Sequence, residues 1–240
     1  MSDKKPLDVL KNCGGYYESP RDQAGKILGP LVAYAGKYKT ADGEEKQWVG
    51  PEYFNFAKAE QNQKIRNFFA GILVRSVCER FSKIPTVVIG MPMGGILLSG
   101  DVGRLLRCRT IFAEKKIIAL ADPAKGLKEM SELVIDRHEI YPGDRVAIIE
   151  DVCNNFSTTE KAVKLITNAG ANFLCILCAV NRSETERWQG WQGYSVISAI
   201  FKPSEQYRQD DLAVADLIAR GKIAWKPKQQ WNVLKASMQK

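Results

Sequence analysis

Histidine is almost absent from this sequence: its 240 residues include one, His138. A single histidine excludes a metal site that is built from several histidines. The sequence also has no apolar run near the ~20 residues that a membrane-spanning helix requires. Residues 1–12 lack the apolar segment of a secretory signal peptide. These absences predict a soluble, cytoplasmic protein with no membrane partner.

Clusters of basic residues are missing too, although the net charge is +8. Lysine and arginine are scattered along the chain, whereas nucleic-acid-binding proteins commonly gather them on one face or arm. A small polyphosphorylated substrate would explain the positive charge at least as well, and a solvated basic surface would explain it without any partner. We therefore expect no nucleic-acid partner.

The six cysteines offer little support for a metal or redox centre, because most have apolar neighbours. Cys175 and Cys178 form a CxxC spacing inside an apparent strand. In a strand, that spacing places the two side chains on opposite faces. We interpret them as small buried hydrophobic residues rather than as a zinc or redox pair.

The overall composition is that of a globular protein, with 45% apolar and 26% charged residues. Residues 1–58 are rich in glycine, proline and aromatic residues, which is typical of short strands and turns. Beyond them, β-rich segments alternate with helical patterns. This alternation predicts an α/β fold with a central, mainly parallel sheet flanked by helices. We expect strands at 86–90, 109–115, 133–140, 146–150, 171–183 and 194–201, and helices at 62–82, 96–106, from 157 and at 210–220.

Two adjacent acids, Glu150 and Asp151, follow the unbroken apolar run 146–149. Such a run is typical of a strand that is buried on both faces. A short polar loop and an amphipathic helix from Ser157 come next. Because ligands of open α/β sheets bind where strands end and helices begin, this segment is a candidate site for a hydroxyl-rich or metal-bearing ligand, with an anion at the helix start. The alternative is an ordinary strand–loop–helix joint with a solvated acid pair.

A second candidate loop, residues 91–95, reads Met-Pro-Met-Gly-Gly and lies between a predicted strand and a predicted helix. Glycine lets backbone N–H groups approach an anion closely, so this arrangement is compatible with phosphate binding. The alternative is that the glycines serve the geometry of the turn alone.

Together these features resemble the type I phosphoribosyltransferases. In that family, the motif that binds phosphoribosyl diphosphate (PRPP) is a hydrophobic strand, two acids and a loop of the form TTGGT or TTGGS. Here the strand and the acids match the motif. The loop reads Asn154, Asn155, Phe156, Ser157 and Thr158. Residues 91–95 fall where the family has its pyrophosphate loop.

Further segments resemble the orotate branch of the family and follow in its order. Residues 113–116 are similar to the start of the mobile catalytic loop of orotate phosphoribosyltransferases, and residues 136–152 to the segment that leads into the PRPP motif. Asn181-Arg182-Ser183 resembles the element whose arginine binds the orotate carboxylate. Residues 51–55, Pro-Glu-Tyr-Phe-Asn, resemble the N-terminal hood that stacks on the base.

The resemblance implies an enzyme of pyrimidine nucleotide biosynthesis that converts PRPP and orotate into orotidine monophosphate and pyrophosphate, with Mg²⁺. Glu150 and Asp151 would hold the ribose hydroxyls and the water shell of the metal, so that no residue binds the metal directly. Lys116 and Lys115 would neutralise the departing pyrophosphate; without the resemblance they would be interpreted as solvated surface charges. Substrate-binding residues would be Asn154, Asn155, Phe156, Ser157, Thr158, Met93, Gly94, Gly95, Arg182, Tyr53 and Phe54.

We also expect a homodimer and a single domain over residues 1–240. Within that domain we expect a hood at 1–60, an α/β core at 61–205, and a C-terminal helix and tail at 206–240. Residues 117–131 lack apolar periodicity, and we expect them to be a poorly ordered active-site lid.

The PRPP loop departs from the family pattern. Phe156 replaces the first glycine and Ser157 the second, Asn154 stands in place of a threonine, and Gly94 stands where some members have a lysine. Ser157 and Glu160 also form the sequence pattern of a capping box, which would occupy amides that otherwise receive phosphate. Three functions stay open: an orotate phosphoribosyltransferase, a binding or regulatory protein of the same fold with a weakened PRPP site, and a transferase for another base.

Overall fold

The computed structural model describes residues 4–120, 130–188 and 194–238. The chain divides into two compact units. The core unit contains residues 60–202, and the terminal unit contains residues 1–59 together with 203–240. The sequence alone did not reveal that the two ends of the chain fold into one unit.

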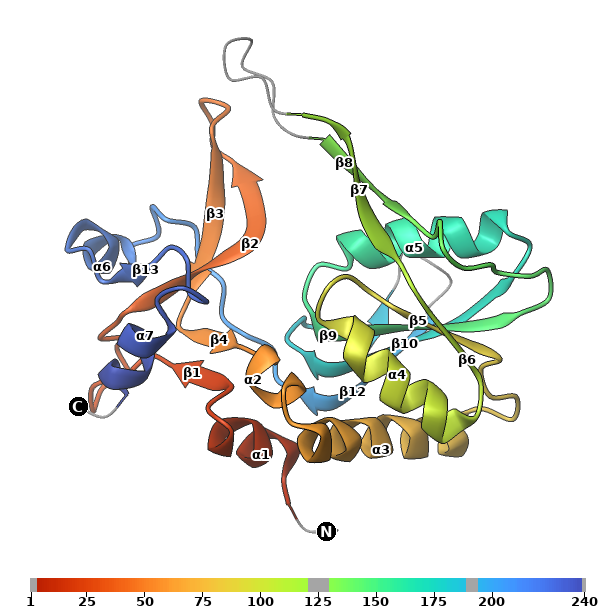
Figure 1. Cartoon of the computed structure of the whole chain (residues 1–240). Helices are drawn as coiled ribbons and strands as arrows, with labels where there is room; N and C mark the ends of the chain where they lie inside the picture. Colours follow the sequence, from red (N-terminus) through yellow and green to blue (C-terminus); the bar gives the residue numbers. More distant parts are fainter. Residues whose placement is uncertain (1–3, 121–129, 189–193, 239–240) are drawn as a thin grey trace. The chain divides into compact units, whose positions relative to one another are not determined.

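A six-stranded sheet, in the order β11-β12-β10-β9-β5-β6, forms the centre of the core unit (Figure 1). All neighbours from β12 to β6 pair in parallel, and only the short β11 pairs antiparallel. The predicted α/β fold with a mainly parallel central sheet is therefore confirmed. The strands are β5 (Val87–Gly90), β6 (Arg109–Phe112), β9 (Arg145–Cys153), β10 (Asn172–Asn181), β11 (Arg187–Trp188) and β12 (Tyr194–Phe201).

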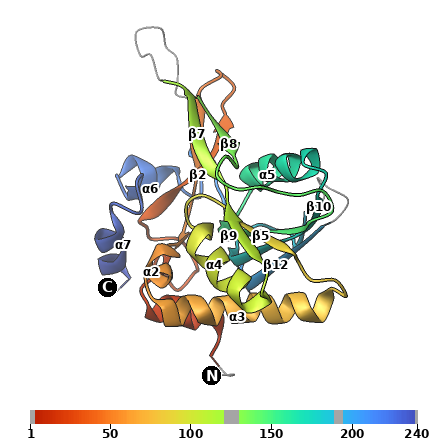
Figure 2. The same ribbon diagram turned by 45° about the vertical axis from the view of Figure 1, so that its right-hand side comes forward.

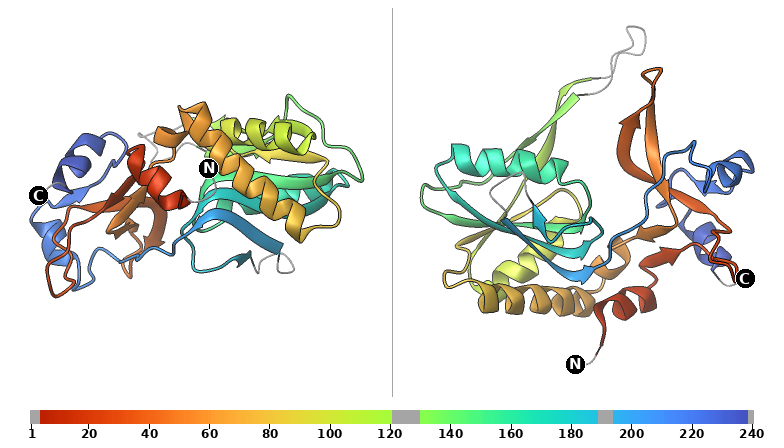
Figure 3. Two further views of the ribbon diagram at one scale, coloured as in Figure 1. Left: turned by 90° about the horizontal axis from the view of Figure 1, so that it is seen from below. Right: turned by 180° about the vertical axis from the view of Figure 1, so that it is seen from behind.

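Helices cover both faces of this sheet. α3 (Gln63–Arg80) and α4 (Gly95–Leu106) lie on one face, and α5 (Ser157–Asn168) lies on the other (Figures 1 and 3). α3 begins where the Asn62 side chain accepts hydrogen bonds from the N–H groups of Lys64 and Ile65, which satisfies donors that have no partner within the helix. The helices that the sequence predicted at 62–82 and 96–106 are confirmed to within a few residues.

The sheet is buried on both faces, as the unbroken apolar runs predicted. All four residues of the run 146–149 in β9 are inaccessible to solvent. Cys175 and Cys178 in β10 are likewise buried, and both are free thiols. Because every parallel strand ends at the same edge of the sheet, the residues that follow β5, β9 and β10 come together there.

Three predicted segments of the core unit differ in the structure. The strand expected at 109–115 is broken after Phe112, and β7 (Glu114–Ala119) begins a separate antiparallel ribbon with β8 (Met130–Val134) (Figure 2). The strand expected at 133–140 ends at Val134, and residues 135–140 are irregular, with a bend at 137–138. The lid expected at 117–131 is wrong at both flanks, which are strands; residues 121–129 lie outside the described residues.

In the terminal unit, β2 (Leu31–Lys39) and β3 (Glu45–Gly50) form a hairpin, and β13 (Ile223–Ala224) pairs with β2. β1 (Tyr16–Glu18) pairs with β4 (Glu52–Phe54). The helix expected at 210–220 is shorter than predicted, and α7 was not predicted at all. The helices are α1 (Pro6–Asn12), α2 (Ala57–Glu60), α6 (Ala215–Ala219) and α7 (Trp231–Ser237).

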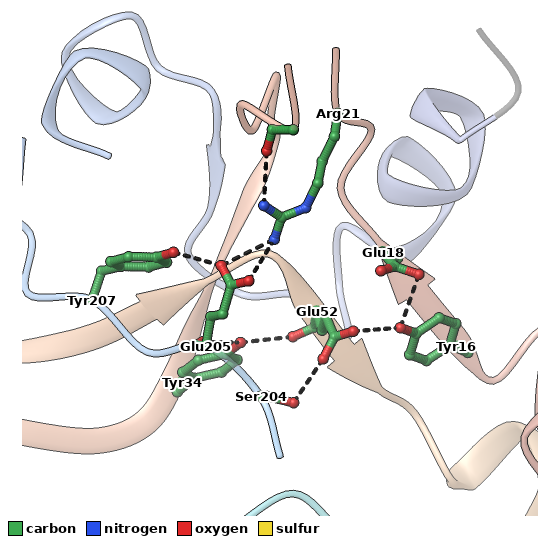
Figure 4. A network of polar contacts seen from close by, with 9 residues as sticks. Tyr16, Glu18, Arg21, Tyr34, Glu52, Ser204, Glu205 and Tyr207 are labelled. Atoms are coloured by element: carbon green, nitrogen blue, oxygen red, sulfur yellow. Dashed lines mark hydrogen bonds and ion pairs between the residues drawn. The ribbon is translucent and has the colours of Figure 1, made fainter. Parts of the chain in front are cut away.

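A polar network ties the returning chain to the strands of the terminal unit (Figure 4). The buried Glu52 carboxylate accepts hydrogen bonds from the Tyr16 hydroxyl at 2.6 Å and the Ser204 hydroxyl at 2.9 Å. Burial and the bond to Glu52 hold the pKa of Tyr16 well above its usual range. Arg21 donates to both carboxylate oxygens of Glu205, at 2.9 and 3.0 Å. This network is structural, because each contact joins elements of one unit.

Candidate functional site

The two acids lie where the sequence predicted them, at the carboxyl end of β9, between β5 and β10. Glu150 and Asp151 are both half-buried. Burial, together with the negative charge of Asp151, raises the pKa of Glu150 to about 8. Near neutral pH the ligand-free site therefore holds a protonated Glu150, which can donate a hydrogen bond as well as accept one.

The loop after β5 lies directly against these acids. The Met91 N–H donates to the Ile149 carbonyl at 2.9 Å. A Cβ atom on Gly94 would lie 2.1 Å from Oδ2 of Asp151, and one on Gly95 would lie 2.1 Å from the Ile149 carbonyl oxygen. Only glycine fits at either position without displacing β9 or its acid, so a lysine at position 94 is incompatible with this position of Asp151.

The same loop has an exposed residue and an unusual peptide bond. The peptide bond between Pro92 and Met93 is cis. The Met93 side chain is 82% exposed. The three predicted residues Met93, Gly94 and Gly95 are thus brought beside the acids, although only the glycines are in close contact with β9.

The loop after β9 places Phe156 in a conformation that glycine adopts more readily. Phe156 has a φ of 57° and a ψ of 11°, in the left-handed region. That conformation costs a non-glycine residue about 1–2 kcal/mol. The Phe156 side chain is 8% exposed and belongs to the hydrophobic core, where its ring centroid lies 6.1 Å from that of Trp188. The ring therefore points into the core and away from the loop backbone.

The predicted capping box at the start of α5 is wrong. Phe156 occupies the N-cap position, and no side chain caps the helix there. Glu160 forms an ion pair with Lys164 instead, at 3.2 Å. Ser157 donates from both its N–H and its hydroxyl to Oδ1 of Asn155, at 3.3 and 3.1 Å. The left-handed Phe156 turns the chain so that Ser157 faces Asn155 rather than Glu160.

Arg182 lies beside the end of β9, because its N–H donates to the Cys153 carbonyl at 3.0 Å. Its side chain is buried. The turn that carries it is held by the Asn181 side chain, whose Oδ1 accepts from the N–H and hydroxyl of Ser183 and whose amide donates to the Thr185 carbonyl. The structure thus brings Arg182, the PRPP loop and the acids to one edge of the sheet.

The predicted lysines lie on the β7–β8 ribbon rather than in a loop. Lys115 and Lys116 are adjacent in β7, so their side chains point to opposite faces of the ribbon. Lys116 forms an ion pair with Asp136 at 3.1 Å, in which both side chains are more than half exposed. The ribbon begins next to the site, because the Ala113 N–H donates to the Gly90 carbonyl at 3.0 Å.

Tyr53 and Phe54 belong to the terminal unit, and both rings pack within it. The Tyr53 ring centroid lies 5.9 Å from that of Trp231, and the Phe54 centroid lies 5.1 Å from that of Tyr16. Their role toward a base stays a prediction.

Two contributors to this site were not predicted, and one predicted residue has an unpredicted contact. Asp136 is the partner of Lys116 and Trp188 is the partner of Phe156, while the predicted Gly94 makes room for Asp151. No spacing in the sequence links these pairs, because each joins segments that meet only in the folded sheet. The replacement of a motif glycine by phenylalanine was the one available signal, since a bulky ring in that position needs a partner.

The donor set fits a metal that is carried by the substrate. Among the described residues, no group of three or more His, Cys, Asp or Glu side chains is placed to hold a metal ion. Mg²⁺ commonly keeps several waters and binds one or two carboxylates plus substrate phosphates, a role that Glu150 and Asp151 suit.

The helices of the described part of the chain are all too short or too polar to cross a membrane.

Comparisons with known proteins concern the sequence and the fold. No family model matches the chain. An orotate phosphoribosyltransferase of Chlorobium phaeobacteroides is 28% identical over 200 residues, covering 82% of this chain and 84% of that protein. The enzyme of that name from Thermotoga maritima is 30% identical over 96 residues, or 40% of this chain. That second match spans only 45% of the length of the Thermotoga protein.

Solved structures resemble the fold. The orotate phosphoribosyltransferase of Aeropyrum pernix has a TM-score of 0.53 at 16% identity, covering 81% of this chain and 92% of that one. An adenine phosphoribosyltransferase of Trypanosoma brucei has a TM-score of 0.54 at 14% identity, covering 84% of this chain and 81% of that one. At such identities the likeness concerns the fold and not the substrate. The chain therefore has the fold of the type I phosphoribosyltransferases and is related in sequence to members of that family named orotate phosphoribosyltransferase.

Proposed function

We propose that this protein transfers the phosphoribosyl group of PRPP to orotate, giving orotidine monophosphate and pyrophosphate. The observation that carries the proposal is the position of Glu150 and Asp151 between two loops suited to phosphates, residues 91–95 and 154–158. The orotate relatives support the choice of base, and the buried Arg182 beside this edge suits the orotate carboxylate.

The residues suit the charge changes of the reaction. The bond between the ribose carbon and the pyrophosphate oxygen breaks with its electron pair on pyrophosphate, and a ring nitrogen of the base supplies the pair for the new bond and loses its proton. Positive charge develops on the ribose, as at other sugar centres, beside the Asp151 carboxylate. Glu150 can form a hydrogen bond with a ribose hydroxyl. Mg²⁺, when bound with PRPP, would neutralise charge on the phosphates.

Phe156 supports a working phosphate loop. A protein that had lost transfer would be expected to place this ring in the phosphate position, whereas the ring is buried among core residues. The Ser157, Thr158 and Thr159 N–H groups at the start of α5 are also free of side-chain caps other than Asn155. Both features favour phosphate binding over a purely regulatory role.

A transfer assay with several bases tests the proposal. The protein is incubated with PRPP, Mg²⁺ and either orotate, adenine or uracil, and nucleotide and pyrophosphate are measured. Orotate-dependent formation of both products is expected. Products with adenine alone would indicate a transferase for another base. PRPP binding by calorimetry without any product would favour the binding or regulatory alternative. Light scattering of the same sample tests the homodimer that we propose from the resemblance.

A further inference from the structure

The PRPP loop of this chain contains a strained residue whose conformation needs support. In the described part of the chain, Arg107 and Phe156 are the non-glycine residues with a positive φ. Such a conformation persists in a bulky residue only where the surroundings over-determine it. Glycine, which the family motif has at this position, can adopt it without such support. Something outside the loop must therefore hold Phe156.

The surroundings of Phe156 include an aromatic neighbour beside the aliphatic core. Its ring centroid lies 6.1 Å from that of Trp188, and the two planes are inclined by 35°. The Trp188 ring in turn meets the Phe173 ring edge-on, with centroids 6.5 Å apart. Phe173 belongs to the buried strand β10. Trp188 is thus fixed against the sheet on one side and contacts Phe156 on the other.

Trp188 is also joined to the turn that carries Arg182. The Thr185 hydroxyl accepts a hydrogen bond from the Arg187 N–H at 2.9 Å and donates to the Arg187 carbonyl. The Thr185 carbonyl in turn accepts bonds from Asn181 and Ser183. Trp188 therefore follows directly after a hydrogen-bonded turn and forms β11 on the edge of the sheet.

We propose that Trp188 is a positioning residue for the phosphate loop: its ring holds Phe156 in the left-handed conformation and so fixes the direction of the amides that follow. The ligand in this inference, PRPP, rests on the proposed function, whereas the contact between Trp188 and Phe156 does not depend on it. Trp188 and Phe156 together replace the glycine of the family motif. Because the amides are pre-organised, phosphate binding avoids the cost of ordering the loop.

The test uses the full chain and the variants Trp188→Ala and Trp188→Phe. Hydrogen exchange of residues 154–160 in the ligand-free protein measures the loop, and calorimetry with PRPP and Mg²⁺ measures affinity. Trp188→Ala should speed exchange in this segment and weaken PRPP binding about tenfold through lost pre-organisation. Trp188→Phe should restore most of both. Trp225→Ala, in the terminal unit, is the matched control and should change neither.

A double variant separates positioning from general stability. Phe156→Gly in the Trp188→Ala background should regain most of the PRPP affinity, because glycine adopts the left-handed conformation unaided. A lower melting temperature for Trp188→Ala with unchanged exchange and affinity would overturn the proposal. If Trp188→Ala does not fold, Trp188→Leu replaces it, and loss of affinity relative to Trp188→Phe is expected.

The two readouts separate this inference from the proposed function. Faster exchange at 154–160 in Trp188→Ala, in a protein whose wild type binds no PRPP, would support the positioning role and refute the function. Equal PRPP affinity and equal exchange in wild type and Trp188→Ala would support the function and refute the positioning role.

Discussion

Two neighbouring carboxylates in one strand can serve different purposes if their surroundings differ. Glu150 is buried enough, and close enough to Asp151, that its pKa rises to about 8. The acid pair therefore carries less negative charge than its sequence suggests when no ligand is bound. Such raised pKa values are common at functional sites, and the cost of ionising the pair is offset only when a metal or a ribose occupies the site.

This environment gives a prediction about stability and pH. Glu150 titrates near 4.5 when unfolded and near 8 when folded, so the folded state binds the proton more tightly. The contribution of Glu150 to the free energy of unfolding is fully present below about pH 4.5 and is lost as the pH rises through about 8. In metal-free buffer at pH 9, the free energy of unfolding of Glu150→Gln should therefore be roughly 1–3 kcal/mol higher than that of the wild type.

Urea unfolding at pH 5.5 and pH 9 measures the effect. The difference between variant and wild type should grow with pH, because titrations of other groups are common to both proteins. A difference that is constant across the range would contradict the raised pKa of Glu150.

Asp151 gives a prediction about activity. Its carboxylate lies against Gly94 at the edge of the sheet, and its Oδ1 accepts a hydrogen bond from the Val152 N–H at 2.8 Å, which an asparagine oxygen can also accept. Asp151→Asn should lower kcat/KM with orotate by roughly 100-fold or more, as for other groups that stabilise charge in a transition state. The free energy of unfolding should change by about 1 kcal/mol or less. Glu160→Gln, an exposed acid on α5, is the matched control and should retain activity.

Phe156 gives a prediction about stability. Its replacement by glycine removes a buried ring, which typically costs about 3–5 kcal/mol, but relieves about 1–2 kcal/mol of left-handed strain. Phe156→Gly should therefore destabilise the protein in urea unfolding while PRPP affinity stays equal or increases. A variant with weakened PRPP binding and unchanged stability would show that the ring contacts the ligand.

At the scale of the element, the β7–β8 ribbon decides how the lysines can act. The ion pair between Lys116 and Asp136 is exposed, and water and salt screen such pairs so that they contribute little to stability. The hydrogen bond to Asp136 raises the pKa of Lys116 and so keeps the lysine charged. The pair can therefore open easily, and a charged lysine is then available to a departing anion.

Lys116→Ala should accordingly lower kcat more than it weakens PRPP binding, because charge on pyrophosphate grows as the bond breaks. Single-turnover kinetics give the rate, and calorimetry gives the affinity. Lys115→Ala, on the opposite face of the ribbon, is the comparison that identifies which lysine acts. Equal losses of rate and affinity in Lys116→Ala would instead indicate ground-state binding.

Elements with a strong apolar pattern could be predicted from the sequence, and weakly patterned ones could not. The run 146–149 predicted β9 and, with it, the position of the acid pair. The ribbon gave no such signal, because Ile117 and Ile118 are exposed on both of its faces and no alternation distinguishes them. Helix α6 is shorter than predicted because residues 212–214 form a turn, in which the Leu212 side chain is exposed.

The site shows the same limit. The positions of the loop and its acids could be predicted from the order of residues. The conformation of Phe156 could not, because the presence of a phenylalanine in a sequence does not indicate a positive φ. The expected capping box failed for the same reason: its spacing was correct, yet the backbone at Phe156 directed Ser157 to Asn155. Local patterns predict partners only where the backbone is regular.

At the scale of the whole molecule, the two ends of the chain share hydrophobic cores. One cluster joins Tyr17, Val32 and Tyr34 with Trp231 and Leu234. The C-terminal residues therefore contribute to the fold of the terminal unit rather than forming a tail. This arrangement makes residues 203–240 necessary for a unit that begins at the other end of the sequence.

Leu234 tests this dependence. Its side chain is fully buried in the shared cluster, whereas that of Leu212 is 97% exposed. Leu234→Ala should lower the free energy of unfolding of the terminal unit by about 2–5 kcal/mol, the usual cost of a buried leucine. Leu212→Ala should change it by roughly 0.5 kcal/mol or less. Hydrogen exchange at residues 31–39 follows the terminal unit, and exchange at residues 145–153 follows the core unit.

Exchange should accelerate at 31–39 in Leu234→Ala and stay close to wild type at 145–153, because compact units with their own cores can unfold separately. Acceleration in both segments would show that the units unfold together. Exchange at 31–39 that is equal in Leu234→Ala and Leu212→Ala would contradict the packing of α7 on the N-terminal strands.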